Sequence, residues 1–127
     1  MSSFSGDTDS NESRGAERNP LHSSQQPMPT PTVTFNRIEL NRILNLYGRM
    51  VADGEWRDYA IDFLKDRAVF SIFRRASEVP IYRVVKDPSL ARKQGAYSVV
   101  AANGQILRRG HELERVLLVI DRKLELV

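Results

Sequence analysis

The residues of this chain best suited to chemistry are its arginines and lysines, which gather in the second half of the sequence. They stand at Arg74, Arg75, Arg83, Arg92, Lys93, Arg108 and Arg109. Lysine and arginine bind phosphate groups whatever the base sequence of a nucleic acid. Arginine beside an exposed aromatic ring such as Phe73 can also stack on single-stranded bases. Five of these cations are therefore candidate contacts to DNA or RNA: Arg74, Arg92, Lys93, Arg108 and Arg109.

A simpler explanation of the cations is that they pair with acids and line a solvated face. The sequence offers Asp58, Asp62, Asp66 and Glu78 as partners. Two of the 19 basic and four of the 16 acidic residues lie in residues 1–34, which leaves the rest of the chain with a formal net charge of +5. Such a domain attracts anions. Nucleic-acid binding is therefore one explanation of this net positive charge, and a solvated basic surface is the other.

Residues that could catalyse a reaction are few. The chain has no cysteine, which excludes disulfides, thiolate chemistry and cysteine-ligated metals. Glycine-rich phosphate loops and the nucleophile-elbow motif are absent. His111 is followed by Glu112 and Glu114, but side chains this close on a helix point in different directions and would not share one metal. We expect no catalytic residue, metal or cofactor. An enzyme for an anionic small molecule would require a pocket that joins arginine with His111 or an acid.

The elements that must position these residues begin with a three-strand meander over residues 56–86. Three runs rich in β-branched and aromatic residues are separated by 65–67 and 77–80, a pattern typical of antiparallel strands. Alternate residues of a strand face opposite sides. We expect one side in the core, which carries Tyr59, Ile61, Phe63, Ala68, Phe70, Ile72, Tyr82 and Val84. The other side is less polar than a sheet face in water should be.

That second side of the predicted sheet is a candidate interface. It combines apolar side chains with arginine, at Phe73, Arg75, Ile81, Arg83 and Val85. Arginine and aromatic residues are enriched in interface cores, and an apolar patch left in water is uncommon for a monomer. The sequence therefore predicts that a second copy of the chain, or another protein, binds through this surface.

Two amphipathic helices and a hairpin complete the predicted fold. Residues 34–52 repeat apolar side chains at helical spacing, with Asn36 as N-cap. A second helix is predicted over residues 110–124, and Asn103-Gly104 indicates a type I′ hairpin turn between two further strands. The expected architecture is a two-layer α+β domain. A mostly antiparallel five-stranded sheet, made of the meander and the hairpin, carries the N-terminal and the C-terminal helix on one face.

The ends of the chain set the predicted domain bounds. Residues 1–33 are rich in serine, asparagine, glutamine and proline and nearly free of large apolar groups, so we expect a disordered leader. Residues 34–127 form one predicted α+β domain. The first residues are polar and acidic, unlike a secretory signal, and no run approaches the roughly 18 apolar residues of a membrane span. We therefore expect a cytoplasmic protein with no membrane partner.

Five segments of the chain resemble a known family of short proteins. They read LYGRMVA at 46–52, EWRDYAIDF at 55–63, YRVVKDP at 82–88, QGAYSVV at 94–100 and RRGHEL at 108–113. The likeness covers residues 36–123 and is to an uncharacterised alphaproteobacterial family catalogued as a domain of unknown function, number 2794. It implies a bacterial cytosolic source and supplies no ligand or catalytic residue. The function we predict from the residues is that of a non-enzymatic binding or regulatory domain.

Overall fold

The computed structural model describes residues 31–75 and 79–121 of the chain. The described elements are one long helix, five strands and three short helical segments. In chain order they are α2 (Arg37–Ala52), β1 (Asp58–Phe63), β2 (Ala68–Phe73), β3 (Tyr82–Lys86), η1 (Pro88–Leu90), β4 (Tyr97–Ala101), β5 (Ile106–Gly110), α3 (Leu113–Leu117) and η2 (Leu118–Ile120). None of the described helices is long and apolar enough to cross a membrane.

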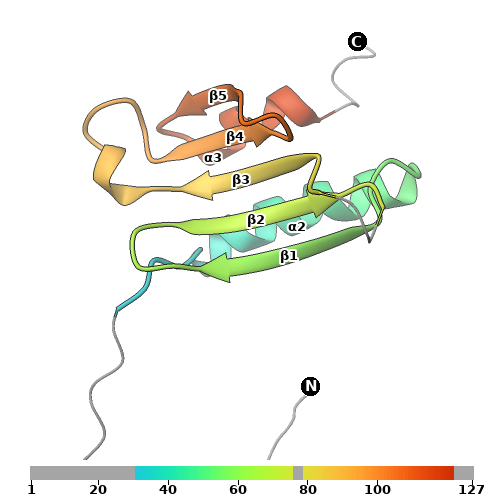
Figure 1. Cartoon of the computed structure of the whole chain (residues 1–127), viewed down its shortest axis with the longest axis horizontal. Helices are drawn as coiled ribbons and strands as arrows, with labels where there is room; N and C mark the ends of the chain where they lie inside the picture. Colours follow the sequence, from blue (N-terminus) through green and yellow to red (C-terminus); the bar gives the residue numbers. More distant parts are fainter. Residues whose placement is uncertain (1–30, 76–78, 122–127) are drawn as a thin grey trace, which may run out of the picture. The chain divides into compact units, whose positions relative to one another are not determined.

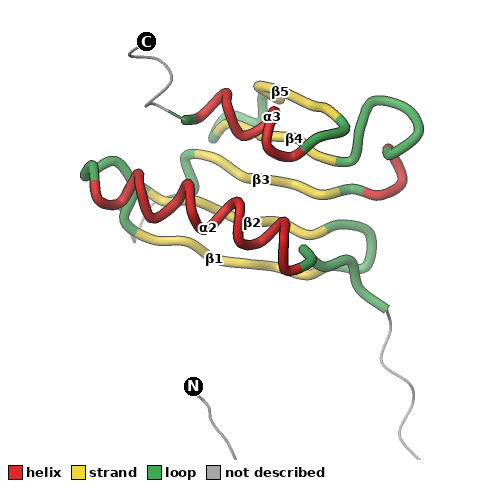
Figure 2. Tube along the Cα trace, turned by 180° about the vertical axis from the view of Figure 1, so that it is seen from behind, coloured by secondary structure: helices red, strands yellow, loops and turns green. Residues whose placement is uncertain are grey.

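The five strands form one antiparallel sheet in the order β1-β2-β3-β4-β5. Figure 1 views this sheet from its helix-free side, and Figure 2 shows from behind that α2 and α3 both lie on the other side. Helix α2 runs along β1 and β2, and α3 lies against β4 and β5. The predicted two-layer α+β fold, with its meander, hairpin and two helices on one face, is confirmed.

Helix α2 begins at a capping box. The Oδ1 atom of Asn36 accepts a hydrogen bond from the Glu39 backbone N–H at 2.8 Å, and Glu39 Oε1 accepts one from the Asn36 N–H at 2.7 Å. Such reciprocal bonds satisfy backbone donors that have no partner inside the helix. After the C-cap Asp53, Gly54 takes a φ of 77°, in the left-handed region that ends many helices. The predicted N-cap at Asn36 and the predicted end of the helix at residue 52 are both confirmed.

The hydrophobic core lies between the sheet and the two helices. The sheet contributes most of its predicted core side, and the helices contribute one face each. Tyr59 and Phe63 of the edge strand β1 were also predicted in the core but are 40% and 43% exposed. The fully buried members include Ile43, Met50, Phe70, Ile72, Val84, Val99 and Val116. Burying a side chain of this size contributes about 2 kcal/mol. This packing fixes which side of each strand faces the helices, and so also which side is left free of them.

The C-terminal helix is shorter than predicted. Strand β5 extends to Gly110, which pairs with Tyr97 of β4, so the first residue of the predicted helix belongs to the sheet. Helix α3 then passes directly into the 3-10 turn η2. Asp121 ends this turn with extended backbone, and its two carboxylate oxygens each accept a hydrogen bond of 3.2 Å from Arg49 of α2. The rest of the predicted helix, residues 122–124, lies outside the described residues.

The β4–β5 turn also differs from the prediction. Ala101 N–H bonds to the Gln105 carbonyl at 2.8 Å, and Gly104 N–H bonds to the Ala101 carbonyl at 2.9 Å. Three residues therefore lie between the paired ends, where a type I′ turn has two. Gly104 has a φ of 90°, as expected of a three-residue loop that closes with a left-handed glycine. A further register shift lies between Val99 and Val100.

Most of the predicted leader falls outside the described residues. Of residues 1–33, the structure describes 31–33. Val33 already belongs to the folded domain, because its N–H donates to the Leu64 carbonyl at 2.8 Å and its side chain packs against the core. Glu78, one of the acids offered as a partner for the arginines, lies in the undescribed segment 76–78.

Candidate interaction surface

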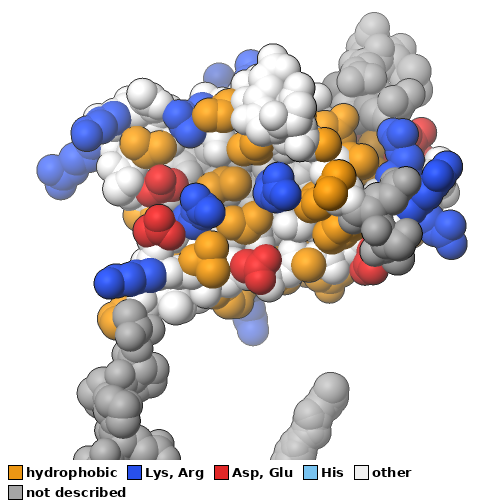
Figure 3. All heavy atoms as spheres, viewed as in Figure 1, with side chains coloured by type: hydrophobic (Ala, Val, Ile, Leu, Met, Phe, Trp, Pro, Cys, Tyr) orange, Lys and Arg blue, Asp and Glu red, His pale blue; other side chains and the backbone are white. Residues whose placement is uncertain are grey.

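We call the helix-free side of the sheet the open face. Strand pairing aligns its residues in rows that cross the strands. One row contains Asp62, Val69, Val85, Ser98 and Arg109, and the next contains Ala60, Ser71, Arg83, Val100 and Ile106. Asp58 and Phe73 pair beyond the second row. Figure 3 shows this face with apolar side chains spread between basic and acidic ones.

Strands β2 and β3 carry three apolar side chains on the open face. Val69 is only 7% exposed, yet it does not belong to the core cluster between the sheet and the helices. Phe73 and Val85 are half-buried and also lie outside that cluster. We call these three residues of β2 and β3 the apolar stripe. The side chains of the apolar stripe lie on the open face and not in the core, so they contribute little to holding the helices on the sheet.

The first row, which we call the Asp62–Arg109 row, carries opposite charges at its two ends. Asp62 lies on β1 and Arg109 on β5, the two edge strands of the sheet. Four strand spacings separate them, which is roughly 19 Å. That distance is too long for an ion pair within one molecule. The row therefore runs from the acid through Val69, Val85 and Ser98 to the base, and the charges at its two ends do not neutralise each other.

The five predicted interface residues do not all lie in this surface. Phe73, Arg83 and Val85 are on the open face, as their pairing partners show. Ile81 precedes β3, donates its N–H to the Ile72 carbonyl at 2.8 Å and packs against the core. Arg75 follows β2 and is exposed outside the sheet. Sequence reasoning missed the charged row, because its members meet only through strand register.

The predicted nucleic-acid contacts are spread over the domain. Arg109 Nη1 donates to Gln94 Oε1 at 2.5 Å, which brings the loop that carries Arg92 and Lys93 to the end of β5. Arg74 follows Phe73 at the opposite end of the strands. Arg108 pairs with the core residue Val99 and so points to the helix side. Among the described residues, those at 74, 83, 92 and 93 form no ion pair.

A surface hollow of about 380 Å³ lies at the free edge of β5, and we call it the β5–α3 hollow. Its lining comes from one segment of the chain: Arg108, Arg109, Gly110, His111, Glu112, Arg115 and Val116. A second hollow of about 440 Å³ shares His111, Glu112 and Arg115 with it and extends to Glu39 and Tyr97. The combination of arginine with His111 or an acid, which an enzyme for an anionic small molecule would require, is therefore present.

The acids beside His111 are engaged with arginines. Glu112 Oε1 lies 2.7 Å from Arg115 Nε, and Glu114 Oε1 lies 3.3 Å from Arg42 Nη1. Within the described ranges 31–75 and 79–121, no group of three histidine, cysteine or carboxylate residues could hold a metal ion. These carboxylates therefore balance neighbouring guanidinium groups.

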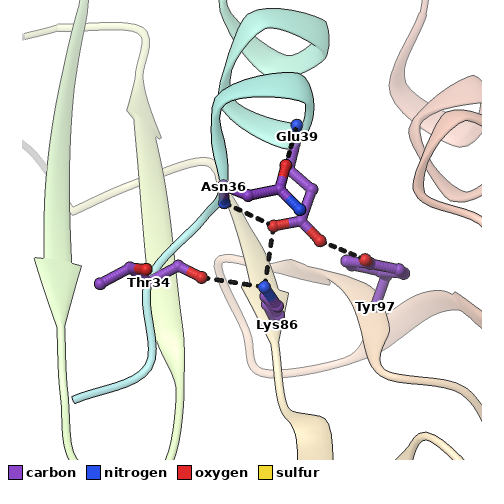
Figure 4. Close-up of polar contacts among 5 residues, drawn as sticks. All are labelled: Thr34, Asn36, Glu39, Lys86 and Tyr97. Atoms are coloured by element: carbon purple, nitrogen blue, oxygen red, sulfur yellow. Dashed lines mark hydrogen bonds and ion pairs between the residues drawn. The ribbon is translucent and has the colours of Figure 1, made fainter. Parts of the chain in front are cut away.

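A buried carboxylate joins α2 to the sheet at the opposite side from the open face. Glu39 is 6% exposed. Besides its capping bond, Glu39 Oε1 lies 2.8 Å from Lys86 Nζ, and Oε2 accepts a hydrogen bond from the Tyr97 hydroxyl (Figure 4). Lys86 Nζ also donates to the Thr34 carbonyl at 2.9 Å. We call Glu39, Lys86 and Tyr97 the Glu39 cluster.

The Glu39 cluster shifts the protonation of its members. Burial alone would raise the pKa of Glu39, but the hydrogen bonds from Lys86, Tyr97 and the Asn36 N–H outweigh burial and hold the pKa below 4.5. Burial and the bond to the Glu39 carboxylate raise the pKa of Tyr97 to about 12. The cluster is thus most stable with an ionised carboxylate and a neutral phenol. The capping-box spacing of Asn36 and Glu39 was its only signal in the sequence.

Together, these elements define a small two-layer α+β domain whose described helices leave one sheet face free. The chain belongs to the family described as Protein of unknown function (DUF2794), whose model matches residues 33–117. The matched segment contains α2, all five strands and α3. Neither the curated proteins nor the solved structures include a match to the chain. The bacterial source and the cytoplasmic location stay predictions.

Proposed function

We propose that this protein is a small non-enzymatic binding domain that pairs with a second copy of itself through the open face. The observation that supports the proposal is the Asp62–Arg109 row, which places Val69 and Val85 of the apolar stripe between an acidic and a basic edge. Two copies can bury Phe73 and Val85, the half-buried members of the stripe, against each other. A surface with opposite charges at its two edges is also complementary to itself when one copy is turned over.

The order of charges selects one way of stacking the two sheets. A two-fold axis parallel to the strands, passing between the two copies of β3, places β1 of one copy over β5 of the other. Asp62 then faces the partner's Arg109, and this contact occurs twice. An axis perpendicular to the strands would instead place β1 over β1 and bring like charges together. We therefore expect the first arrangement, with Val85 near the centre.

The size of the open face limits the affinity. Five strands about 4.8 Å apart, each about five residues long, present roughly 400 Å² of flat area. A standard interface buries about 800 Å² on each partner. The dimer should therefore be reversible, with a dissociation constant of about 1 µM to about 1 mM.

Arg83 opposes this association. Arg83 lies on the central strand in the row beside Val85. The same two-fold axis therefore brings it near Arg83 of the second copy. Packed sheets cross at about −30°, which displaces the two guanidinium groups sideways and lets them turn toward solvent. The Arg83→Met change should tighten a dimer by removing this repulsion. If the partner were instead an acidic protein, the same change would weaken binding.

The first experiment measures the mass of the full chain in solution across that concentration range by sedimentation equilibrium. Wild type should pass from monomer to dimer, and Phe73→Asp and Val85→Asp should stay monomeric. The matched control is Ile38→Asp on α2, which places the same charge at a residue that is 65% exposed on the helix side; it should dimerise normally. A wild type that stays monomeric throughout the range contradicts the proposal.

The second experiment tests the predicted stacking. Asp62→Arg alone and Arg109→Asp alone should each weaken the dimer, because each puts like charges opposite one another twice. An equimolar mixture of the two variants should restore association, since both contacts in the mixed dimer again join opposite charges. If the mixture stays monomeric while Phe73→Asp still separates wild-type copies, the face is right and the stacking is wrong.

A second candidate function is nucleic-acid binding at the end of β5, because the Arg109–Gln94 bond gathers Arg109 with Arg92 and Lys93. A labelled single strand should then bind at about 50 mM salt and lose most of its affinity at about 200 mM. The Arg92→Ala/Lys93→Ala variant should weaken binding, and Arg74→Ala, at the other end of the sheet, serves as its control. No binding at the lower salt concentration would remove this candidate.

A further inference from the structure

The β5–α3 hollow concentrates positive charge in one place. Its lining residues include three arginines, Arg108, Arg109 and Arg115, and a single acid, Glu112. With His111 neutral, the formal charge of the lining is +2. Arginine is the preferred side chain for phosphate, because its planar fork donates two parallel hydrogen bonds.

The edge position of β5 explains how neighbouring residues reach one hollow. Arg108 and Arg109 point to opposite sides of the sheet, as their partners Val99 and Ser98 show. In a central strand, their side chains would be separated by the sheet itself. Strand β5 is an edge strand, so two long side chains from opposite sides can both bend around its free edge. Arg115 approaches from α3.

The backbone next to the hollow is closely packed at Gly95 and Gly110. A Cβ atom on Gly95 would lie 2.1 Å from the Gly110 carbonyl carbon, so the two backbones are in direct contact. A Cβ on Gly110 would lie 3.3 Å from Cγ2 of Val116, which is 1% exposed. Arg109 and His111 flank Gly110 in sequence. A rigid support of this kind lowers the entropy cost of ordering the groups that bind a ligand.

One residue of the lining has a buried donor without an acceptor. Arg109 Nε is screened from solvent and makes no hydrogen bond to any described residue, although Nη1 of the same side chain is bonded to Gln94. A buried polar atom without a partner is uncommon and is often explained by a ligand or ion. The other two arginines are only partly engaged: Arg108 Nη1 donates a long 3.4 Å bond to the Arg115 carbonyl, and Arg115 pairs with Glu112.

We propose that the β5–α3 hollow binds the phosphate group of a small phosphorylated molecule. A phosphate dianion matches the lining charge of +2 and supplies acceptors for all three arginines. The volume of about 380 Å³ lies in the range of small-molecule pockets, so a phosphate would leave space for the group it is attached to. The site shares Arg109 with the proposed dimer contact, but Arg108 and Arg115 do not lie on the open face, so variants of these two residues test phosphate binding separately from dimerisation.

The test uses glycerol 2-phosphate as the probe, with glycerol as its neutral counterpart, titrated into the full chain at constant ionic strength by calorimetry. We expect saturable binding of the phosphate with a dissociation constant near about 1 mM and none of glycerol. Arg108→Gln and Arg115→Gln should each weaken binding at least about fivefold, since each removes a charge-assisted contact. Arg57→Gln, an exposed arginine just before β1, is the matched control and should bind as wild type.

A variant that is expected to bind phosphate more tightly provides a test that misfolding cannot imitate. Glu112→Gln removes the only acid of the lining and frees Arg115, so it should tighten phosphate binding severalfold while the fold is unchanged by circular dichroism. Lack of saturation by wild type at about ten times the expected dissociation constant would overturn the proposal. So would arginine variants that bind like Arg57→Gln, or a Glu112→Gln variant that binds no more tightly than wild type.

Discussion

Glu39 Oε1 lies 2.8 Å from Lys86 Nζ, although 47 residues separate the two side chains along the sequence. The side chain of Glu39 is 8% exposed and that of Lys86 is 19% exposed. This ion pair ties the first turn of α2 to the end of β3, and the Tyr97 hydroxyl extends it to β4. It lies on the helix side of the sheet, so its role is to hold the two layers together.

Replacing Lys86 should destabilise the domain. Lys86→Met leaves the Glu39 carboxylate buried without its cation, and we expect a loss of about 2 to 3 kcal/mol in the free energy of unfolding. Urea unfolding followed by Trp56 fluorescence measures it. Lys65→Met, in the exposed β1–β2 turn, is the control and should change stability by less than about 0.5 kcal/mol. Equal effects of the two changes would show that the ion pair contributes nothing.

Stability should fall in acid through Glu39. Its pKa is lowered by folding, so the folded state favours the ionised carboxylate. The stabilisation is therefore present above the unfolded value of 4.5 and is lost as the pH falls below it. Unfolding free energies measured from about pH 3 to about pH 7 should rise more steeply for wild type than for Glu39→Gln. Parallel curves for the two proteins would contradict the lowered pKa.

Tyr97 should ionise only at a pH well above the ordinary pKa of a tyrosine. Its pKa is raised from 10.0 to about 12, so the neutral phenol is the form that the fold stabilises. This contribution is complete below pH 10 and disappears as the pH approaches 12. Tyrosinate absorbance should show a component near pH 12 that is missing in Tyr97→Phe. Burial and the charge of Asp58 also raise the pKa of Tyr47, so Tyr47→Phe is the control that should retain the component.

Two glycines should respond to alanine in opposite ways. Gly95 has a φ of 106°, and an added Cβ would lie 2.1 Å from the Gly110 backbone; Gly95→Ala should cost at least about 3 kcal/mol. Gly48, inside α2, has no atom within 4 Å of such a Cβ, so Gly48→Ala should raise stability by up to about 1 kcal/mol. Thermal unfolding separates the two outcomes. A Gly95→Ala protein as stable as wild type would contradict the close contact beneath the β5–α3 hollow.

Local patterns in the sequence determined the elements and their orientation. Alternation placed Phe70, Ile72 and Val84 in the core, and helical spacing with Asn36 placed α2. These patterns can be recognised in the sequence because the periodicity of a strand or a helix involves only a few neighbouring residues. They failed at the β5–α3 junction, where pairing of Gly110 with Tyr97 outweighed a helical preference. A partner 13 residues away in the sequence cannot be read from local spacing.

Only the tertiary structure decided which charges share a surface. Asp62 and Arg109 became the ends of one row through four successive strand pairings, and a register slip of one residue in any strand would have moved its side chains to the other face. Glu39, Lys86 and Tyr97 met because α2 packs across the sheet. The amino-acid sequence thus determined what each element is, by short-range periodicity. Hydrogen-bond register and layer packing, which join residues far apart in the chain, decided which side chains can act together.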